Sequence, residues 1–129
     1  MEVLVDTHVF VWAMTEPERI TARALEILAD LDTVVWVSAV SAWEIATKVR
    51  IGKLPGAEFL VLDYGDHVRA WHADSLVVES ADALVAGAFV WGNRDPFDRM
   101  IGAQSLRRGI PLISADAAFD EISGVERVW

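Results

Sequence analysis

Residues 3–7 of the chain, Val3-Leu4-Val5-Asp6-Thr7, form an apolar run that ends in an aspartate and a threonine. A short run of consecutive apolar residues is typical of a strand that is covered on both faces of a sheet. An aspartate at the end of such a run can begin a helix, because its side-chain oxygens accept hydrogen bonds from free backbone N–H groups. The stretch therefore predicts a buried strand with Asp6 at its carboxyl end, directly before a helix.

The rest of the chain repeats this alternation of short apolar runs and helical patterns. Further strands are expected at Val34–Val37, Leu76–Val78, Ile110–Ser114 and Val125–Trp129. Helices are expected at Pro17–Leu31, Ala42–Val49, Asp66–Ala73, Ala81–Val90 and Asp95–Arg108. Strands that alternate with helices are joined by right-handed crossovers, so the pattern predicts an α/β fold with a central, mainly parallel sheet and helices on both faces. No repeat or linker divides the chain, and residues 1–129 are expected to form one domain.

The composition limits the class of protein. The chain has 129 residues, 53% of them hydrophobic, which is enough for one sizeable core. It has no cysteine, which excludes disulfides, thiolate metal sites and cysteine nucleophiles. The first residues lack the basic and long apolar regions of a signal peptide, and no apolar run approaches the ~18 residues of a membrane span. We therefore expect a soluble, cytoplasmic protein that does not enter a membrane.

The formal net charge of −9 argues against a broad electrostatic attraction to nucleic acid, which depends on lysine and arginine. The basic residues are nevertheless clustered. One group is Lys48, Arg50 and Lys53, and the other is Arg94, Arg99, Arg107 and Arg108. Each cluster fits either a solvated helix face or the basic rim of a binding site.

Acidic residues follow the predicted strands. Asp6 follows the first strand and Glu44 lies soon after the second, Asp95 and Asp98 open the late helix, and Asp116 follows Ile110–Ser114. In a parallel sheet the carboxyl ends of the strands lie at one edge, where these folds bind their ligands. Carboxylates gathered there repel one another, so such a cluster needs a cation.

Each acid also has a purely structural explanation. Ser41-Ala42-Trp43-Glu44 matches a capping box, and Asp95 with Pro96 matches a helix start in which Asp98 faces the positive end of the helix dipole. Asp6 and Asp116 can cap the helices that they precede. These explanations hold for single residues and weaken when all five acids are considered together.

Oxygen ligands without cysteine or paired histidines select Mg²⁺ or Mn²⁺ rather than zinc or copper. A hydroxyl such as that of Thr7 or Ser114 can hold a ligand or a metal-bound water in place. Carboxylate clusters with one or two such metals hydrolyse phosphodiesters. The metal would let an acidic pocket accept a polyanion, with four basic residues expected on its rim: Lys48, Arg50, Arg94 and Arg99.

Four segments together resemble a known family. They are VDTHVFVW (5–12), VSAVSAWEIATKVRIGKL (37–54), RDPFDRMIGAQSL (94–106) and PLISADAAF (111–119). In order and spacing they are similar to the PIN-domain nucleases, specifically the VapC-type toxins of bacterial toxin–antitoxin pairs, over essentially the whole chain.

The resemblance implies a Mg²⁺-dependent endoribonuclease that forms a homodimer and is silenced by a cognate antitoxin. It implies that Asp6, Glu44, Asp98 and Asp116 form the catalytic metal site, with Asp95 in a supporting role as helix cap. Many relatives have histidine where this chain has Asn93, which bears only on a rim contact. A reasonable RNA target is a structured RNA with an accessible loop, such as transfer or ribosomal RNA.

Other interpretations stay open or are set aside. A receiver-type phosphoacceptor domain needs a lysine after its last core strand, and this chain has only Lys48 and Lys53. A PIN-like RNA- or protein-binding module without catalysis is the main alternative. His67 and His72 are expected on the surface. His8 is expected at a helix start, although its position directly after Asp6 and Thr7 would let it touch the site. The tryptophans are expected mainly in the core, with Trp12 or Trp43 able to flank the cleft.

Overall fold

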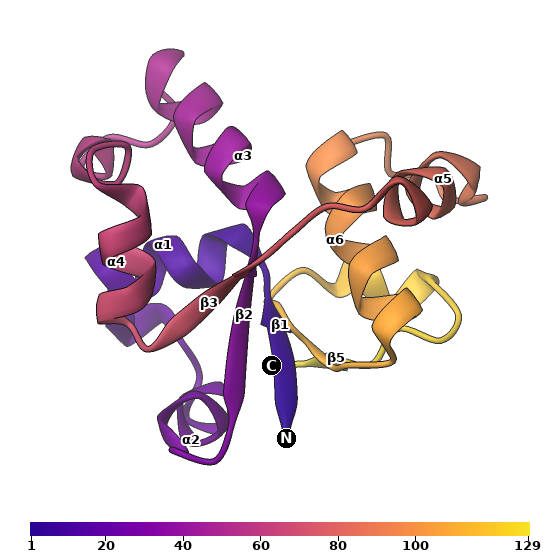
Figure 1. Cartoon of the computed structure of the whole chain (residues 1–129), viewed down its shortest axis with the longest axis horizontal. Coiled ribbons are helices and arrows are strands. Elements are labelled where there is room, and N and C mark those ends of the chain that lie inside the picture. The colour runs from indigo at the N-terminus through magenta and orange to yellow at the C-terminus, as the bar shows by residue number, and fades with distance from the viewer.

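Five parallel strands in the order β3-β2-β1-β4-β5 form the central sheet of the computed structural model, which describes residues 1–129 (Figure 1). The strands are β1 (Glu2–Val5), β2 (Val34–Ser38), β3 (Ala73–Leu76), β4 (Leu112–Ile113) and β5 (Arg127–Val128). All four pairings are parallel, with Val3 beside Val35 and Leu4 beside Leu112. The predicted α/β fold is confirmed, and the sheet is entirely parallel.

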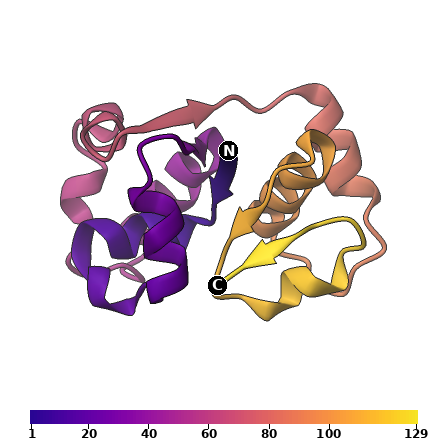
Figure 2. The same cartoon turned by 90° about the horizontal axis from the view of Figure 1, so that it is seen from below.

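Helices cover both faces of this sheet. The α-helices are α1 (Thr7–Thr15), α2 (Ala22–Ala29), α3 (Ala39–Arg50), α4 (Tyr64–Ala70), α5 (Ser80–Ala88) and α6 (Pro96–Arg108), with 3₁₀ turns at Pro17–Arg19, Glu58–Leu60 and Ala117–Glu121. Figure 2 shows α5, α6 and the C-terminal segment on one side and the N-terminal helices on the other. None of the helices has the length and apolar content that a membrane crossing requires.

Alternation along β1 divides the core in two. Val3 and Val5 pack with α1, α2 and α4 in the larger cluster, whereas Leu4 packs with Ile101 of α6 and Phe119 in the smaller one. All three β1 residues are fully buried. A strand whose side chains alternate between two covered faces must be apolar throughout, which is the pattern that residues 3–5 show.

Two predicted elements differ from the structure. The single helix expected at Pro17–Leu31 is a 3₁₀ turn followed by α2, because Thr21 caps α2 by accepting a hydrogen bond from the Ala24 N–H at 3.2 Å. The strand expected at Leu76–Val78 lies earlier, at Ala73–Leu76, since β3 pairs with β2 over these residues and Val77 is 65% exposed.

The capping box expected at Ser41–Glu44 is wrong. Helix α3 begins earlier, at Ala39, where the Ser38 hydroxyl accepts a hydrogen bond from the Val40 N–H at 3.1 Å. Ser41 is instead buried and shares a 2.8 Å hydrogen bond with the hydroxyl of Thr7. Glu44 therefore lies in the second turn of α3 and is free from any capping role.

Candidate active site

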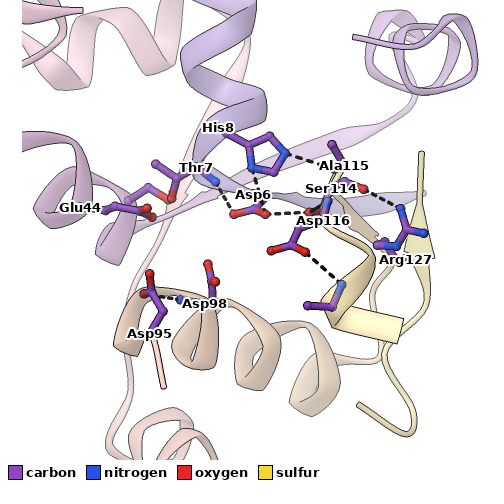
Figure 3. Close-up of polar contacts among 12 residues, drawn as sticks. Asp6, Thr7, His8, Glu44, Asp95, Asp98, Ser114, Ala115, Asp116 and Arg127 are labelled. Atoms are coloured by element: carbon purple, nitrogen blue, oxygen red, sulfur yellow. Dashed lines mark hydrogen bonds and ion pairs between the residues drawn. The ribbon is translucent and has the colours of Figure 1, made fainter. Parts of the chain in front are cut away.

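A cavity of about 210 Å³ lies at the carboxyl edge of the sheet and is lined by all five acids that the sequence analysis singled out. The acids are Asp6, Glu44, Asp95, Asp98 and Asp116, joined by Thr7, His8, Val11, Trp12, Lys48 and Leu54. In Figure 3 their carboxylates face one another from above and below a common space. The fold thus brings together residues more than a hundred positions apart, as the parallel topology predicts.

Asp6 is held rigidly at the end of β1. Its Oδ1 accepts a hydrogen bond from the Thr7 N–H at 2.8 Å, and its Oδ2 accepts one from the Ser114 hydroxyl at 2.7 Å (Figure 3). Burial of this carboxyl raises its pKa to about 7; the Ser114 bond opposes that rise, and the charges of Glu44 and Asp116 add to it. The carboxylate is therefore oriented but poorly stabilised as an anion.

The two aspartates at the start of α6 have different hydrogen-bond partners. Asp95 caps the helix, since its Oδ1 accepts hydrogen bonds from the N–H groups of Phe97 at 2.8 Å and Asp98 at 3.2 Å. Asp98 accepts one from the Asn93 side-chain amide at 2.9 Å. Burial raises the pKa of Asp98 to about 7; the hydrogen bond from Asn93 opposes that rise, and the charges of Asp6, Asp95 and Glu44 add to it.

Glu44 has one satisfied and one unsatisfied oxygen. Its Oε2 accepts a hydrogen bond from Lys48, one turn further along α3, while Oε1 is buried without a hydrogen-bond partner. Burial lowers the pKa of Lys48, but the bond to Glu44 and the charges of Asp95 and Asp98 raise it above its usual value overall. Lys48 therefore stays charged and neutralises part of the cluster.

Asp116 lies at the exposed mouth of the cavity. Its Oδ1 accepts a hydrogen bond from the Ala118 N–H at 3.0 Å and so caps the 3₁₀ turn Ala117–Glu121. Its own N–H donates to the Ser114 hydroxyl at 3.0 Å. Ser114 does not line the cavity, but it links Asp116 to Asp6 and is buried.

His8 lies in the first turn of α1, as expected, and it also lines the cavity, as its position directly after Asp6 and Thr7 allows. Its Nε2 accepts a hydrogen bond from the Ala115 N–H at 3.1 Å, so the ring proton lies on Nδ1, 3.3 Å from Oδ2 of Asp6. Burial lowers the pKa of His8 to about 4, although Asp116 and Glu44 act in the opposite direction. The imidazole is neutral at physiological pH.

The predicted basic rim is only partly present. Lys48 lines the cavity, whereas Arg50 and Arg94 are exposed and do not. Arg99 does not lie on the rim, because its guanidinium donates to four backbone carbonyls, those of Ala86, Phe89, Trp91 and Asn93, at 2.6–3.3 Å. Its role is to brace the segment that precedes α6.

Trp12 forms one wall of the cavity, with its ring centroid 4.6 Å from that of His8. Trp43 is 60% exposed and packs edge-on against Phe97, outside the lining. Of the two tryptophans expected to flank the cleft, only Trp12 lines the cavity.

The donor chemistry of the cavity suits a hard cation, although its side-chain positions do not yet form a coordination sphere. No group of three acidic or histidine side chains is arranged to hold one metal ion. The donors are nevertheless carboxylate oxygens, the Oε1 of Glu44 lacks a partner, and Asp6 and Asp98 both have pKa values raised to about 7. A cation would favour the charged form of these carboxyls, and carboxylate oxygens suit hard divalent cations such as Mg²⁺ and Mn²⁺.

The family model for the PIN domain matches residues 3–125. The chain therefore belongs to the PIN-domain family, which confirms that part of the sequence resemblance and excludes the receiver domain. No match is found among curated proteins.

Solved structures share the fold along nearly the whole chain. VapBC2 of Rickettsia felis, bound to a DNA fragment from its promoter, has a TM-score of 0.67 at 13% identity and covers 99% of this chain and 98% of its own. A toxin–antitoxin complex from Klebsiella pneumoniae has a TM-score of 0.64 at 14% identity, covering 95% and 94%. VapBC-5 from Mycobacterium tuberculosis, of the VapBC family of toxin–antitoxin systems, has a TM-score of 0.61 at 21% identity, covering 98% and 97%.

Proposed function

We propose that the protein is a metal-dependent endoribonuclease that acts in the cytoplasm as the toxin of a VapC-type toxin–antitoxin pair. The observation that carries this proposal is the set of five carboxylates around one cavity, from four separate segments of the chain. Such a cluster is costly without a cation, and carboxylate-bound metals are used for phosphodiester hydrolysis. Membership of the PIN family and the fold shared with toxin–antitoxin complexes support the same function.

Asp6, Glu44, Asp98 and Asp116 are the residues that would hold Mg²⁺, or Mn²⁺ in its place. Bound metal supplies the activation of water and the charge stabilisation that phosphodiester hydrolysis needs. Asp95 supports the site as the cap of α6, and Thr7 and Ser114 support it by fixing Asp6.

Side chains and a backbone N–H of the protein orient these acids by hydrogen bonds to their carboxylate oxygens. Ser114 and the Thr7 N–H fix both oxygens of Asp6, Asn93 fixes Asp98, and Lys48 neutralises part of the charge on Glu44. The cavity offers no free imidazole nitrogen as a general base, because the Nε2 of its one histidine, His8, already accepts the Ala115 N–H. This arrangement favours metal-assisted chemistry over a histidine mechanism.

Cleavage of RNA by the purified protein tests the proposal. We expect cleavage with Mg²⁺ or Mn²⁺ and none in excess chelator, with products that carry a 5′-phosphate and a 3′-hydroxyl. Transfer and ribosomal RNA are the first substrates to examine, since their loops expose single-stranded bases and backbone. Full activity in chelator would refute the metal requirement.

A non-catalytic RNA- or protein-binding module is the second candidate. One observation favours it, namely that no three acidic or histidine side chains are arranged to hold a single ion. The same assay separates the candidates, because such a module would bind RNA or protein without cutting RNA at any metal concentration.

We propose that a small antitoxin is the main protein partner and that the toxin is a homodimer. A net charge of −9 and a cavity lined by carboxylates favour a partner that carries an arginine or another cation into the site. Co-expression with the product of a neighbouring small gene should give a complex that does not cleave RNA, and its mass should report the dimer. A partner that leaves cleavage unchanged would argue against the toxin role.

A further inference from the structure

A second cleft of about 430 Å³ adjoins the acidic cavity. The two share Val11, Trp12 and Leu54 as lining residues, so a chain that leaves the acidic cavity across Trp12 enters this cleft directly. Its size is within the ~300–1,000 Å³ range of pockets that hold organic ligands. Its other walls come from the turn after α1 and from the loop that follows α3, and they carry Arg19 and Lys53.

The charge of this cleft is opposite to that of the acidic cavity. Arg19 and Lys53 line it, and Glu16 is its only acid. No acidic side chain forms an ion pair with Lys53. Arg19 pairs with Glu16 at 3.3 Å, but these side chains are 50% and 52% exposed, and exposed pairs of this kind are weak. Both cations are therefore available to an anion.

The cleft is shaped before any ligand binds. The Arg19 guanidinium lies 4.1 Å from the centre of the Trp12 ring, a cation–π contact that holds its side chain against the wall. The opposite wall is fixed by the Lys53 N–H, which donates to the carbonyl of Lys48 at 2.8 Å, and by the Gly56 N–H, which donates to Glu58 at 2.8 Å. A preformed site loses little conformational freedom on binding.

We propose that this cleft binds the single-stranded RNA next to the bond that is cut, with Arg19 and Lys53 holding the phosphate of a flanking nucleotide. The inference rests on the proposed ribonuclease function. It adds the path of the substrate, in which the RNA strand runs from the acidic cavity across Trp12 into this cleft. A negatively charged protein needs such a local cationic subsite, because its overall charge repels RNA.

Charge-neutralising variants of opposite sign test the proposal. Lys53→Gln and Arg19→Gln should each raise KM for a short unstructured RNA by about three- to fivefold with kcat nearly unchanged, since they remove binding that does not change during the reaction. Glu16→Gln should lower KM, because it frees Arg19 from its competing partner. For the two cation variants the slope of log KM against log salt should decrease by about 0.7 each.

Arg23→Gln and Glu18→Gln are the matched controls. Both side chains are exposed and lie outside the cleft, yet these substitutions change the net charge by the same amounts. KM values for the controls that stay close to wild type, beside opposite shifts for Lys53→Gln and Glu16→Gln, would support the subsite. Cleavage by the wild-type protein with equal KM shifts in cleft and control variants would overturn the subsite and leave the ribonuclease function standing. A wild-type protein that does not cut RNA with any divalent metal would instead overturn the function, and the subsite with it.

Discussion

Asp6 and Asp98 are carboxyl groups placed where a negative charge is unfavourable. Burial is the main cause at both positions, and neighbouring carboxylates add to it, so that each pKa rises from 3.8 to about 7. Both side chains are at the same time oriented by hydrogen bonds, from Ser114 and Asn93. Carboxyl groups that are fixed in place, and whose ionised form is unfavourable without a nearby positive charge, are well suited to bind a cation.

The raised pKa of Asp98 predicts how pH affects stability without metal. A carboxyl with a higher pKa in the folded state binds more protons there than in the unfolded state, so its contribution is largest below pH 3.8 and is lost as the pH rises towards 7. Asp98→Asn removes this titration. In chelator, the melting temperature of the variant relative to wild type should therefore rise from pH 4 to pH 7.

The difference between the two proteins is the quantity to measure. The pKa of His8 is lowered to about 4, so its contribution to the stability rises with pH instead of falling. Wild type and variant both carry His8, and its contribution is therefore common to both. Parallel curves of melting temperature against pH for wild type and Asp98→Asn would contradict the raised pKa.

Arg99 is expected to position Asp98 through Asn93. Its guanidinium bonds the carbonyl of Asn93 at 2.8 Å, and the Asn93 amide in turn bonds Asp98 at 2.9 Å. Arg99→Lys keeps the charge but cannot reach four carbonyls, so we expect a loss of roughly 1–3 kcal/mol in unfolding free energy and slower RNA cleavage. Denaturant unfolding and cleavage rates measure both, with exposed Arg23→Lys as control. An Arg99→Lys protein of wild-type stability would show that these bonds contribute little.

Local chemistry explains which site residues could be predicted from the sequence. Asp6, Asp95 and Asp98 were predictable because a strand end or a helix start marks each of them within a few residues. The contacts of His8 and Arg99 were not predictable. The hydrogen-bond partner of His8 is 107 residues away, and Arg99 contacts the last turn of α5 and the irregular segment after it. Long-range partners leave no local pattern in a single sequence.

Helices α5 and α6 are joined by a buried ionic cluster that is separate from the site. Asp82 is fully buried and accepts hydrogen bonds from Arg107 and Arg108. Burial raises the pKa of Asp82, but the hydrogen bonds from Arg108, the Glu79 N–H and Arg107 together outweigh it and lower the pKa to about 2. This carboxylate thus holds two arginines of α6 against α5.

Asp82→Asn should be among the more destabilising single substitutions. Removing one partner of a buried pair costs roughly 3–5 kcal/mol. Because both arginines are partly exposed, we expect the lower end, about 3 kcal/mol. The contribution of Asp82 is present above pH 3.8 and is lost as the pH falls towards 2. Glu79→Gln, at the exposed end of the cluster, should cost less than about 1 kcal/mol. Equal losses for the two variants in urea unfolding would contradict this account.

Helix α6 agrees with the sequence prediction, whereas the helix expected at Pro17–Leu31 is broken in the structure. Helix α6 runs from Pro96 to Arg108 and ends at Gly109 in the left-handed conformation, as its cap residues predict. The break at Ile20 and Thr21 was missed because apolar residues continue at helical spacing across it. Ile20 is buried in the core and Thr21 caps the next helix, so the hydrophobic pattern alone could not reveal the turn.

The whole sheet is needed to assemble the site. Its carboxylates come from segments that begin at Asp6 and end at Asp116, and they meet only when β1, β2 and β4 lie side by side in parallel. The alternation of strands and helices made this convergence predictable. The distances among the carboxylates were not predictable, because they depend on side-chain packing. Since the unfolded chain cannot gather these groups, a metal that binds them must stabilise the folded protein.

Thermal melting of the protein in chelator and in increasing Mn²⁺ tests most directly whether these carboxylates form one metal site. We predict that Mn²⁺ raises the melting temperature of the wild type. Asp98→Asn should melt no lower than wild type in chelator and should lose most of the Mn²⁺-induced rise, because it removes repulsion together with a ligand. Asp95→Asn should keep most of that rise, since asparagine caps a helix about as well as aspartate. An Asp98→Asn protein with the full wild-type response to Mn²⁺ would contradict the account and leave Asp98 as part of a helix start.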